Sequence, residues 1–239
     1  METTNFKFEL LKATPLSSIP DEIKGMTHQM GYAEEDYYEQ FPCFLGPRQI
    51  ARFISFFECY QMTLGLAGHM AEVGVFRGAV SMFLTKLAML YEQNSITQVH
   101  GFDWFKPPEG VEEPGSPANY HEPYDRLQKL VNIQGLQSYL FLHKMDVVTE
   151  LKGFFETNSH LQFKLVFLDA GSYDIVATCI QEFWPRLSNG GIMIFDQFNH
   201  EVAPGETRAV KDLLPSDAII KTFPNGWMPT AYVVKGQKL

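Results

Sequence analysis

The 239-residue sequence has few cysteines and no clustered basic tract. Its three cysteines, Cys43, Cys59 and Cys179, are widely spaced, which is unlike the spacing of zinc ligands. Cys59 and Cys179 lie in apolar helical sequence, so we expect buried free thiols in a reducing cytoplasm rather than disulfides. The formal net charge of −9 disfavours a nucleic-acid partner, because no basic face is available to displace counterions from phosphates.

Long hydrophobic runs are also missing. No stretch approaches the roughly 20 apolar residues that span a bilayer, and the first ten residues lack the basic start and apolar core of a signal peptide. We therefore expect a cytoplasmic protein with no membrane partner. The chain is 45% hydrophobic, which suits one main domain with a substantial core. We place this domain at residues 46–239, after a polar and aromatic N-terminal cap segment over residues 1–45.

A proline at the start and an apolar stripe predict a helix over residues 47–64. The residues of this stripe, which we expect to pack in the core, are Ile50, Phe53, Ile54, Phe57 and Tyr60.

Strand-like and helix-like segments alternate along the rest of the chain. Buried strands are expected near residues 69–75, 96–103, 138–146, 163–170 and 190–198, with helices between them. Strands that are apolar throughout are typical of a parallel sheet covered on both faces. Near the end of the chain, residues 218–223 and 230–235 flank a Pro-Asn-Gly turn and predict an antiparallel hairpin on this sheet.

Every predicted parallel strand ends in an acidic side chain. These acids are Glu72, Asp103, Asp146, Asp169 and Asp196. Because ligands bind outside the carboxyl ends of parallel strands, we expect the five side chains to line one edge of the sheet. A single acid there is often a helix N-cap, whereas five favour a polar binding site.

The first strand leads into a bend, Glu72-Val-Gly74-Val-Phe-Arg77-Gly78, which lacks the third glycine of a dinucleotide-binding turn. Gly74 and Gly78 have no Cβ, so they either let a ligand approach the backbone or only permit a tight turn. Asp103, at the end of the next strand, can accept two hydrogen bonds from a ribose diol. Glu72 would repel a phosphate and attract a cation. An adenosyl sulfonium therefore fits this bend better than a nicotinamide cofactor does.

Several segments together resemble the macrolide-sugar O-methyltransferases of the macrocin type, which are class I S-adenosylmethionine-dependent enzymes. The segments are AEVGVFRG, HGFDWF, LDAGSYD, EFWPRLSNGG, and FDQF followed by PGETRAV. The resemblance runs from about Arg48 to Lys235. It implies an α/β fold with a doubly wound, mostly parallel seven-stranded sheet whose last strand is antiparallel. It also implies methyl transfer from S-adenosylmethionine to a hydroxyl of a sugar or sugar-bearing small metabolite.

The resemblance also implies which residues contact the cofactor. They are Glu72, Gly74, Arg77, Asp103 and Asp146. We extend this predicted cofactor site to neighbouring positions, namely Gly78, Trp104, Met145 and Asp169.

A Mg²⁺ site is a further expectation. Asp169, Asp196 and Gln197 come from adjacent strand ends and offer the oxygen ligands that Mg²⁺ prefers. Relatives in the resembled family often bind Mg²⁺, but their pattern has further aspartates where this chain has Gly171 and Gln197. Two carboxylates must bind the ion more weakly than three or four. The alternative is that Asp169 and Asp196 cap turns or orient the substrate directly.

The hydroxyl that accepts the methyl group must lose its proton to a base. Asp169 is one candidate base, and His200 is another because histidine titrates near neutral pH. The loop over residues 105–125, rich in proline, glycine and acid, is expected to cover the site. Two alternatives stay open: a metal-independent methyltransferase, and an accessory protein that binds the cofactor without catalysis. The aromatic N-terminal segment favours a homo-oligomer.

Overall fold

A computed structural model describes residues 31, 33–106, 123–224, 226 and 228–237. Most of the predicted cap segment and most of the predicted covering loop lie outside these described residues. What is described begins with a short helix, α3 (Glu34–Glu39), and a 3₁₀ turn, η1 (Phe41–Phe44).

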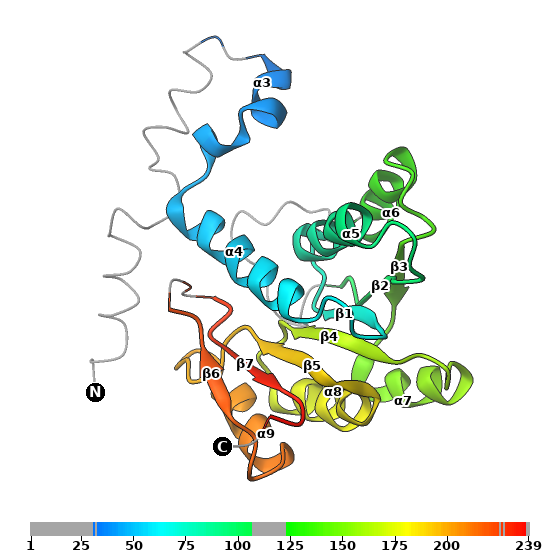
Figure 1. Ribbon diagram of the computed structural model, residues 1–239, viewed down its shortest axis with the longest axis vertical. Coiled ribbons are helices and arrows are strands. Elements are labelled where there is room, and N and C mark those ends of the chain that lie inside the picture. Colours follow the sequence, from blue (N-terminus) through cyan, green and yellow to red (C-terminus); the bar gives the residue numbers. More distant parts are fainter. Residues whose placement is uncertain (1–30, 32, 107–122, 225, 227, 238–239) are drawn as a thin grey trace.

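A seven-stranded sheet with the order β3-β2-β1-β4-β5-β7-β6 forms the centre of the fold (Figure 1). The strands are β1 (His69–Val73), β2 (Val99–Asp103), β3 (Leu140–Lys144), β4 (Phe163–Leu168), β5 (Leu187–Phe195), β6 (Ile220–Thr222) and β7 (Ala231–Val234). Strands β1 to β5 pair in parallel, whereas β7 runs antiparallel to both β5 and β6. This arrangement confirms the predicted doubly wound sheet, including its antiparallel last strand.

Helices cover both faces of the sheet, with α4, α5 and α6 on one face and α7, α8 and α9 on the other (Figure 1). The helices are α4 (Pro47–Met62), α5 (Ala79–Tyr91), α6 (Pro123–Ile133), α7 (Val147–Thr157), α8 (Tyr173–Arg186) and α9 (Pro204–Leu213). Successive side chains of β1 point to opposite faces: Met70 joins the core under α4 and α5, while Ala71 and Val73 join the core under α7 and α8. Two buried faces explain why the strands read as continuous apolar runs.

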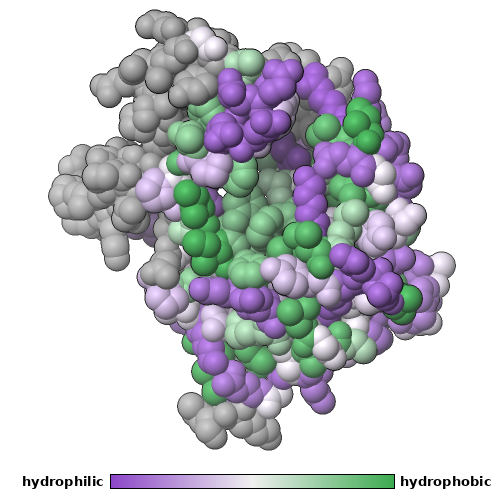
Figure 2. Space-filling model, turned by 45° about the horizontal axis from the view of Figure 1, so that its top comes forward, coloured by the Kyte–Doolittle hydropathy of each residue, from purple (hydrophilic) through white to green (hydrophobic). Residues whose placement is uncertain are grey.

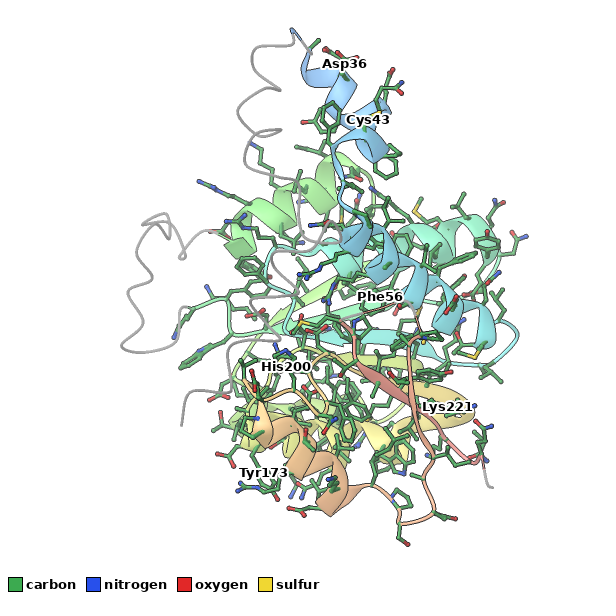
Figure 3. All side chains as sticks on the ribbon, turned by 90° about the vertical axis from the view of Figure 1, so that its left-hand side faces the viewer. Asp36, Cys43, Phe56, Tyr173, His200 and Lys221 are labelled. Carbon is green, nitrogen blue, oxygen red and sulfur yellow. The ribbon has the colours of Figure 1, made fainter. Side chains whose placement is uncertain are left out.

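The buried face of α4 differs from the predicted one. Ile50 and Ile54, in the predicted stripe, are 40% and 44% exposed, whereas Phe56 is fully buried. Phe56 lies between α4 and the sheet (Figure 3), and its ring packs edge-on against Phe167 of β4 at 4.7 Å. The predicted stripe was therefore wrong for Ile50 and Ile54 but right for Tyr60, which is fully buried. The packing of Phe56 on the sheet turns the two isoleucines outward.

The exposed part of the stripe lines an apolar groove between η1, α4 and α5. Its other walls include Phe41, Met82 and Phe83. Figure 2 shows a hydrophobic hollow bordered by hydrophilic residues on the face that comes forward with the top of Figure 1.

The cysteines behave as expected within the described part of the chain. All three are free, and Cys59 and Cys179 are buried, while Cys43 is exposed on η1, away from the sheet (Figure 3). Among the described residues, no helix combines the length and apolar character needed to cross a bilayer.

A pair of histidines lies inside the sheet region, where water cannot stabilise a charge. Nδ1 of His100 on β2 lies 3.0 Å from Nε2 of His143 on β3, and the two rings stack. Burial lowers the pKa of His100 to about 3, helped by the nearby His143, and lowers the pKa of His143 to about 4. Both side chains are therefore neutral in the folded protein at neutral pH.

This pair predicts a loss of stability in acid. The unfolded chain binds protons at these sites below about pH 6.5, but the folded chain does not, so the free energy of unfolding falls as pH drops. From pH 6.5 to 4 the contribution of His100 is on the order of 3 kcal/mol. Urea unfolding of a His100→Leu variant should show a flatter dependence over this range than the natural chain. Replacing the exposed His160 by glutamine is the control, and an equal flattening there would refute the assignment.

Candidate active site

The acids at the carboxyl ends of β1, β4 and β5 form one charged cluster. Glu72 ends β1, Asp169 follows β4 and Asp196 follows β5, and these strands are neighbours in the sheet. Glu72 and Asp196 are buried, and each interacts electrostatically with Asp169. The structure therefore brings together three of the five acids that the sequence placed at this edge.

Glu72 anchors the helix that follows the bend. Its carboxylate accepts a hydrogen bond from the backbone N–H of Ser81 at 2.7 Å and another from the Ser81 hydroxyl. Because Ser81 lies in the first turn of α5, this contact also places a carboxylate at the positive end of the helix dipole. Burial raises the pKa of Glu72 to about 8, although the Ser81 hydrogen bonds favour the ionised form.

Asp103 ties together the two loops beside the predicted adenosyl site. Its carboxylate accepts hydrogen bonds from the backbone N–H groups of Phe76 at 2.8 Å and Phe105 at 2.5 Å. Both phenylalanines have positive φ angles, 50° and 52°, which residues other than glycine rarely adopt. Asp103 thus holds a strained loop pair in place. Each carboxylate oxygen has a second lone pair, so the ribose contact predicted for Asp103 is compatible with these bonds.

The two glycines of the bend are needed for packing within the chain. A Cβ on Gly74, whose φ is +89°, would lie 2.0 Å from the backbone oxygen of Asp169. A Cβ on Gly78 would lie 2.5 Å from the side chain of Leu127 on α6. The tight-turn explanation therefore accounts for both glycines, and their contact with a cofactor stays a prediction.

The other predicted cofactor residues lie around the same edge with different neighbours. Arg77 is exposed, and its guanidinium lies 5.1 Å above the Phe76 ring. Trp104 is 42% exposed beside Lys106, whereas Met145 packs against the core under α7 and α8. Asp146 is the N-cap of α7 and accepts the N–H of Val148 at 3.0 Å.

A residue that the sequence analysis did not identify, Arg52 of α4, bridges two of the acids. Its Nη1 donates to Oδ1 of Asp196 at 2.6 Å, and its Nη2 donates to Oδ2 of Asp169 at 3.2 Å. The guanidinium also lies 5.4 Å from the ring of Phe56 and 5.5 Å from that of Phe167. The available signal was the spacing of Arg52, Phe56 and Tyr60, which places the arginine on the face of α4 that is buried.

Glu206 of α9 is a second missed residue of the site. It is fully buried, its Oε1 accepts the backbone N–H of Gln197 at 2.7 Å, and its Oε2 has no hydrogen-bond partner. Burial raises the pKa of Glu206 to about 8, and the charges of Asp196 and Asp169 add to this effect. Glu206 lies in the first turn of α9, where acids are common, so its sequence position alone does not mark it as part of a site.

The site thus gathers carboxyl groups from Glu72, Asp169 and Asp196 around the guanidinium of Arg52, and Glu206 interacts with Asp169 and Asp196. Burial and the Asp196 charge raise the pKa of Asp169 to about 7 against the opposing effect of Arg52. Burial is the main cause of the raised pKa values of Glu72, Asp169 and Glu206, and repulsion between neighbouring acids adds to it. A nearby cation would favour the ionised form of each group. A cationic ligand such as a sulfonium with its ammonium group therefore fits the donor set.

The same arrangement does not fit a divalent metal at Asp169, Asp196 and Gln197. One oxygen of each aspartate already accepts a hydrogen bond from Arg52. In the described ranges, no group of three or more His, Cys, Asp or Glu side chains is arranged to hold a metal ion. A fixed guanidinium and a Mg²⁺ ion at the same carboxylates would repel each other. We therefore route no step of the chemistry through a metal.

His200 lies on the loop between β5 and α9, in the region labelled in Figure 3. Its Nδ1 accepts the backbone N–H of Val202 at 3.2 Å. A neutral imidazole that accepts at Nδ1 carries its proton on Nε2, so the remaining nitrogen is a donor rather than a base. Of the two candidate bases, this geometry favours Asp169.

Comparisons with known proteins show the family of the chain and the class of its fold. Residues 71–198, more than half of the chain, match the family model described as a methyltransferase domain. A comparison with curated proteins found no match.

Among solved structures, the fold is similar to that of CalS11, described as a calicheamicin methyltransferase. The TM-score is 0.76 at 20% identity, covering 92% of this chain and 94% of that chain. It is also similar to the O-methyltransferase NovP, with a TM-score of 0.59 at 15% identity over 81% of this chain and 82% of that one. These likenesses confirm the Rossmann-like methyltransferase fold, and the family match shows that the chain belongs to the methyltransferase-domain family.

Proposed function

We propose that the protein is an S-adenosylmethionine-dependent O-methyltransferase whose acceptor is a hydroxyl of a sugar or of a sugar-bearing small metabolite. The family match supports S-adenosylmethionine as the cofactor. The observation that carries the acceptor class is the similarity to CalS11 over nearly the whole of both chains, because CalS11 is described as a TDP-rhamnose 3′-O-methyltransferase. NovP, also similar, is described as an O-methyltransferase.

The residues of this chain have distinct roles in the proposed reaction. Bound S-adenosylmethionine supplies a methyl group attached to a positively charged sulfur. The carboxylates of the cluster favour this cation, and Asp103 is available to the ribose hydroxyls. The remaining predicted cofactor residues are Glu72, Gly74, Arg77, Gly78, Trp104, Met145 and Asp146, and their contacts are part of the proposal.

Asp169 is the proposed proton acceptor. Its side chain is 30% exposed, so it can reach an acceptor hydroxyl at the edge of the sheet, unlike the Asp196 side chain at 4%. With the cofactor bound, the acceptor oxygen would form a bond to the methyl carbon while the carbon–sulfur bond breaks and its electron pair stays on sulfur. The hydroxyl proton passes to the carboxylate of Asp169. A pKa of about 7 places this group near the range in which a general base works best at neutral pH.

A two-part experiment tests the proposal. Calorimetry with S-adenosylhomocysteine should show binding, and an Asp103→Ala variant should bind about tenfold more weakly because the ribose contact is lost. Methyl-labelled S-adenosylmethionine should then transfer label to at least one acceptor in a panel of TDP-sugars, glycosylated metabolites and sugar-free phenols. Label found only on phenols would contradict the sugar assignment.

Two earlier alternatives are separated by the same experiment. Binding of S-adenosylhomocysteine without any labelled product would favour an accessory protein that has lost catalysis. Transfer that does not require a divalent ion would favour the metal-independent enzyme, which the contacts of Arg52 support. A homo-oligomeric state and a cytoplasmic location stay predictions.

A further inference from the structure

The two aspartates at the ends of β4 and β5 are held by a cation that belongs to the chain itself. Arg52 reaches them from α4, more than a hundred residues earlier in the sequence. Its fork donates one nitrogen to each carboxylate rather than both to one. A guanidinium keeps its charge and its planar geometry, so it can bridge two carboxylates in a fixed orientation.

Aromatic packing fixes the guanidinium in this bridging position. The rings of Phe56, one turn further along α4, and Phe167, on β4, both lie within 5.5 Å of it. Burial alone would lower the pKa of Arg52, but the charges of Asp196 and Asp169 outweigh that effect and raise it. The side chain is therefore a permanent positive charge, held by both the helix and the sheet.

Two described positions beside the aspartates, 171 and 197, offer no acid to a competing ion. Gly171 has no side chain, and the space beside it is filled by Gln197, whose Oε1 would lie 2.7 Å from a Cβ at position 171. Gln197 carries no charge. Glu206, another carboxyl group of the cluster, uses Oε1 to accept the backbone N–H of Gln197, and its buried Oε2 has no hydrogen-bond partner among the described residues. The pair Asp169 and Asp196 thus has Arg52 as its partner, and positions 171 and 197 add no charge to it.

We propose that Arg52 replaces a divalent cation at this site and is the positioning residue that holds Asp169 as proton acceptor, so that the chain transfers methyl groups without a metal. Arg52 binds one oxygen of Asp169, which leaves the other for the acceptor hydroxyl. Arg52 acts through Asp169 rather than on the substrate. The role of Asp169 as proton acceptor rests on the proposed function. The binding of a metal, in contrast, can be measured whether or not any acceptor is methylated.

The test is a titration of the full-length protein with Mn²⁺, followed by electron paramagnetic resonance of the free ion. The natural chain should show no site-specific uptake. An Arg52→Ala variant frees both carboxylates and should bind Mn²⁺ at least about tenfold more tightly, because the competing charge is gone. Adding Asp196→Asn to this variant should abolish the gain. If Arg52 only stabilised the fold, its replacement would not lead to an increase in Mn²⁺ binding.

Two results of the titration would overturn the inference. One is stoichiometric Mn²⁺ uptake by the natural chain that Asp196→Asn removes. The other is a folded Arg52→Ala variant with no gain in uptake. If that variant does not fold, Arg52→Gln serves in its place, since glutamine retains part of the packing against Phe56 and Phe167. Where an acceptor from the panel is methylated, the rate after exhaustive chelation should stay within about twofold of the untreated rate. A complete loss of activity restored by Mg²⁺ would also overturn the inference.

Discussion

Replacing Asp169 by asparagine is expected to lower the rate constant of methyl transfer by about 10²–10⁴-fold, the usual contribution of a general base. The amide keeps the shape of the side chain and can still accept a hydrogen bond from Arg52, but it cannot take a proton from the acceptor hydroxyl. Binding of S-adenosylhomocysteine should change little, because its thioether sulfur carries no positive charge for Asp169 to stabilise and asparagine keeps the shape of the side chain. The measurement is the turnover of methyl-labelled S-adenosylmethionine with an acceptor identified from the panel.

The pH dependence provides a second and independent reading of the same variant. Since the pKa of Asp169 is raised to about 7 by burial and by Asp196, the fraction of ionised base rises through neutral pH. The natural chain should therefore gain activity between about pH 6 and 8, and Asp169→Asn should lose that limb. Asp174→Asn, at an exposed position in the first turn of α8, is the matched control. If Asp169→Asn turns over at the natural rate, the base lies elsewhere, and His200 becomes the next residue to replace.

The sheet was predictable because each of its strands can be identified from its own short apolar segment of sequence. A run such as residues 163–168 is apolar at almost every position. This pattern is typical of a strand that is buried on both of its faces. One member of that run, Lys164, is an exception that local sequence cannot explain. Its ammonium is fully buried and pairs at 2.5 Å with Glu92, which lies at the end of α5. A pair separated by 72 positions along the chain leaves no trace in local hydrophobic periodicity.

The candidate site was predictable only in part, for a related reason. Acids at strand ends follow directly from the order of strands, so Glu72, Asp169 and Asp196 could be placed together. Arg52 could not, because its role depends on how α4 rotates over the sheet. The rotation follows the packing of Phe56 on Phe167 rather than the count of apolar residues. The contacts of Arg52 change the chemistry expected of the site. Instead of a metal ion, the guanidinium of Arg52 neutralises the two aspartates.

Replacing Gly74 by alanine is expected to destabilise the protein by about 3 kcal/mol, from backbone strain and overpacking together. The new Cβ would lie 2.0 Å from the backbone oxygen of Asp169, which is fixed in place by the pairing of β1 with β4. Backbone atoms cannot move aside as the end of a flexible side chain can. The strand end that carries Asp169 must therefore shift, and methyl transfer should fall together with stability. Urea unfolding at neutral pH measures the first effect and labelled turnover the second.

A Gly65→Ala variant is the control that separates the effect of the steric clash from the effect of the positive φ angle. The φ of Gly65, +83°, is close to the +89° of Gly74, but a Cβ added there would meet nothing within 4 Å. Gly65→Ala should therefore cost only the strain of a positive φ, about 1 kcal/mol, and leave turnover unchanged. The difference between the two variants then measures the contact with Asp169 alone. Equal losses of stability in both variants would mean that Gly74 is needed only for its positive φ angle and not for the close approach to Asp169. In that case the carboxyl end of β4 would be free to adjust, and the position of Asp169 would not depend on the bend after β1.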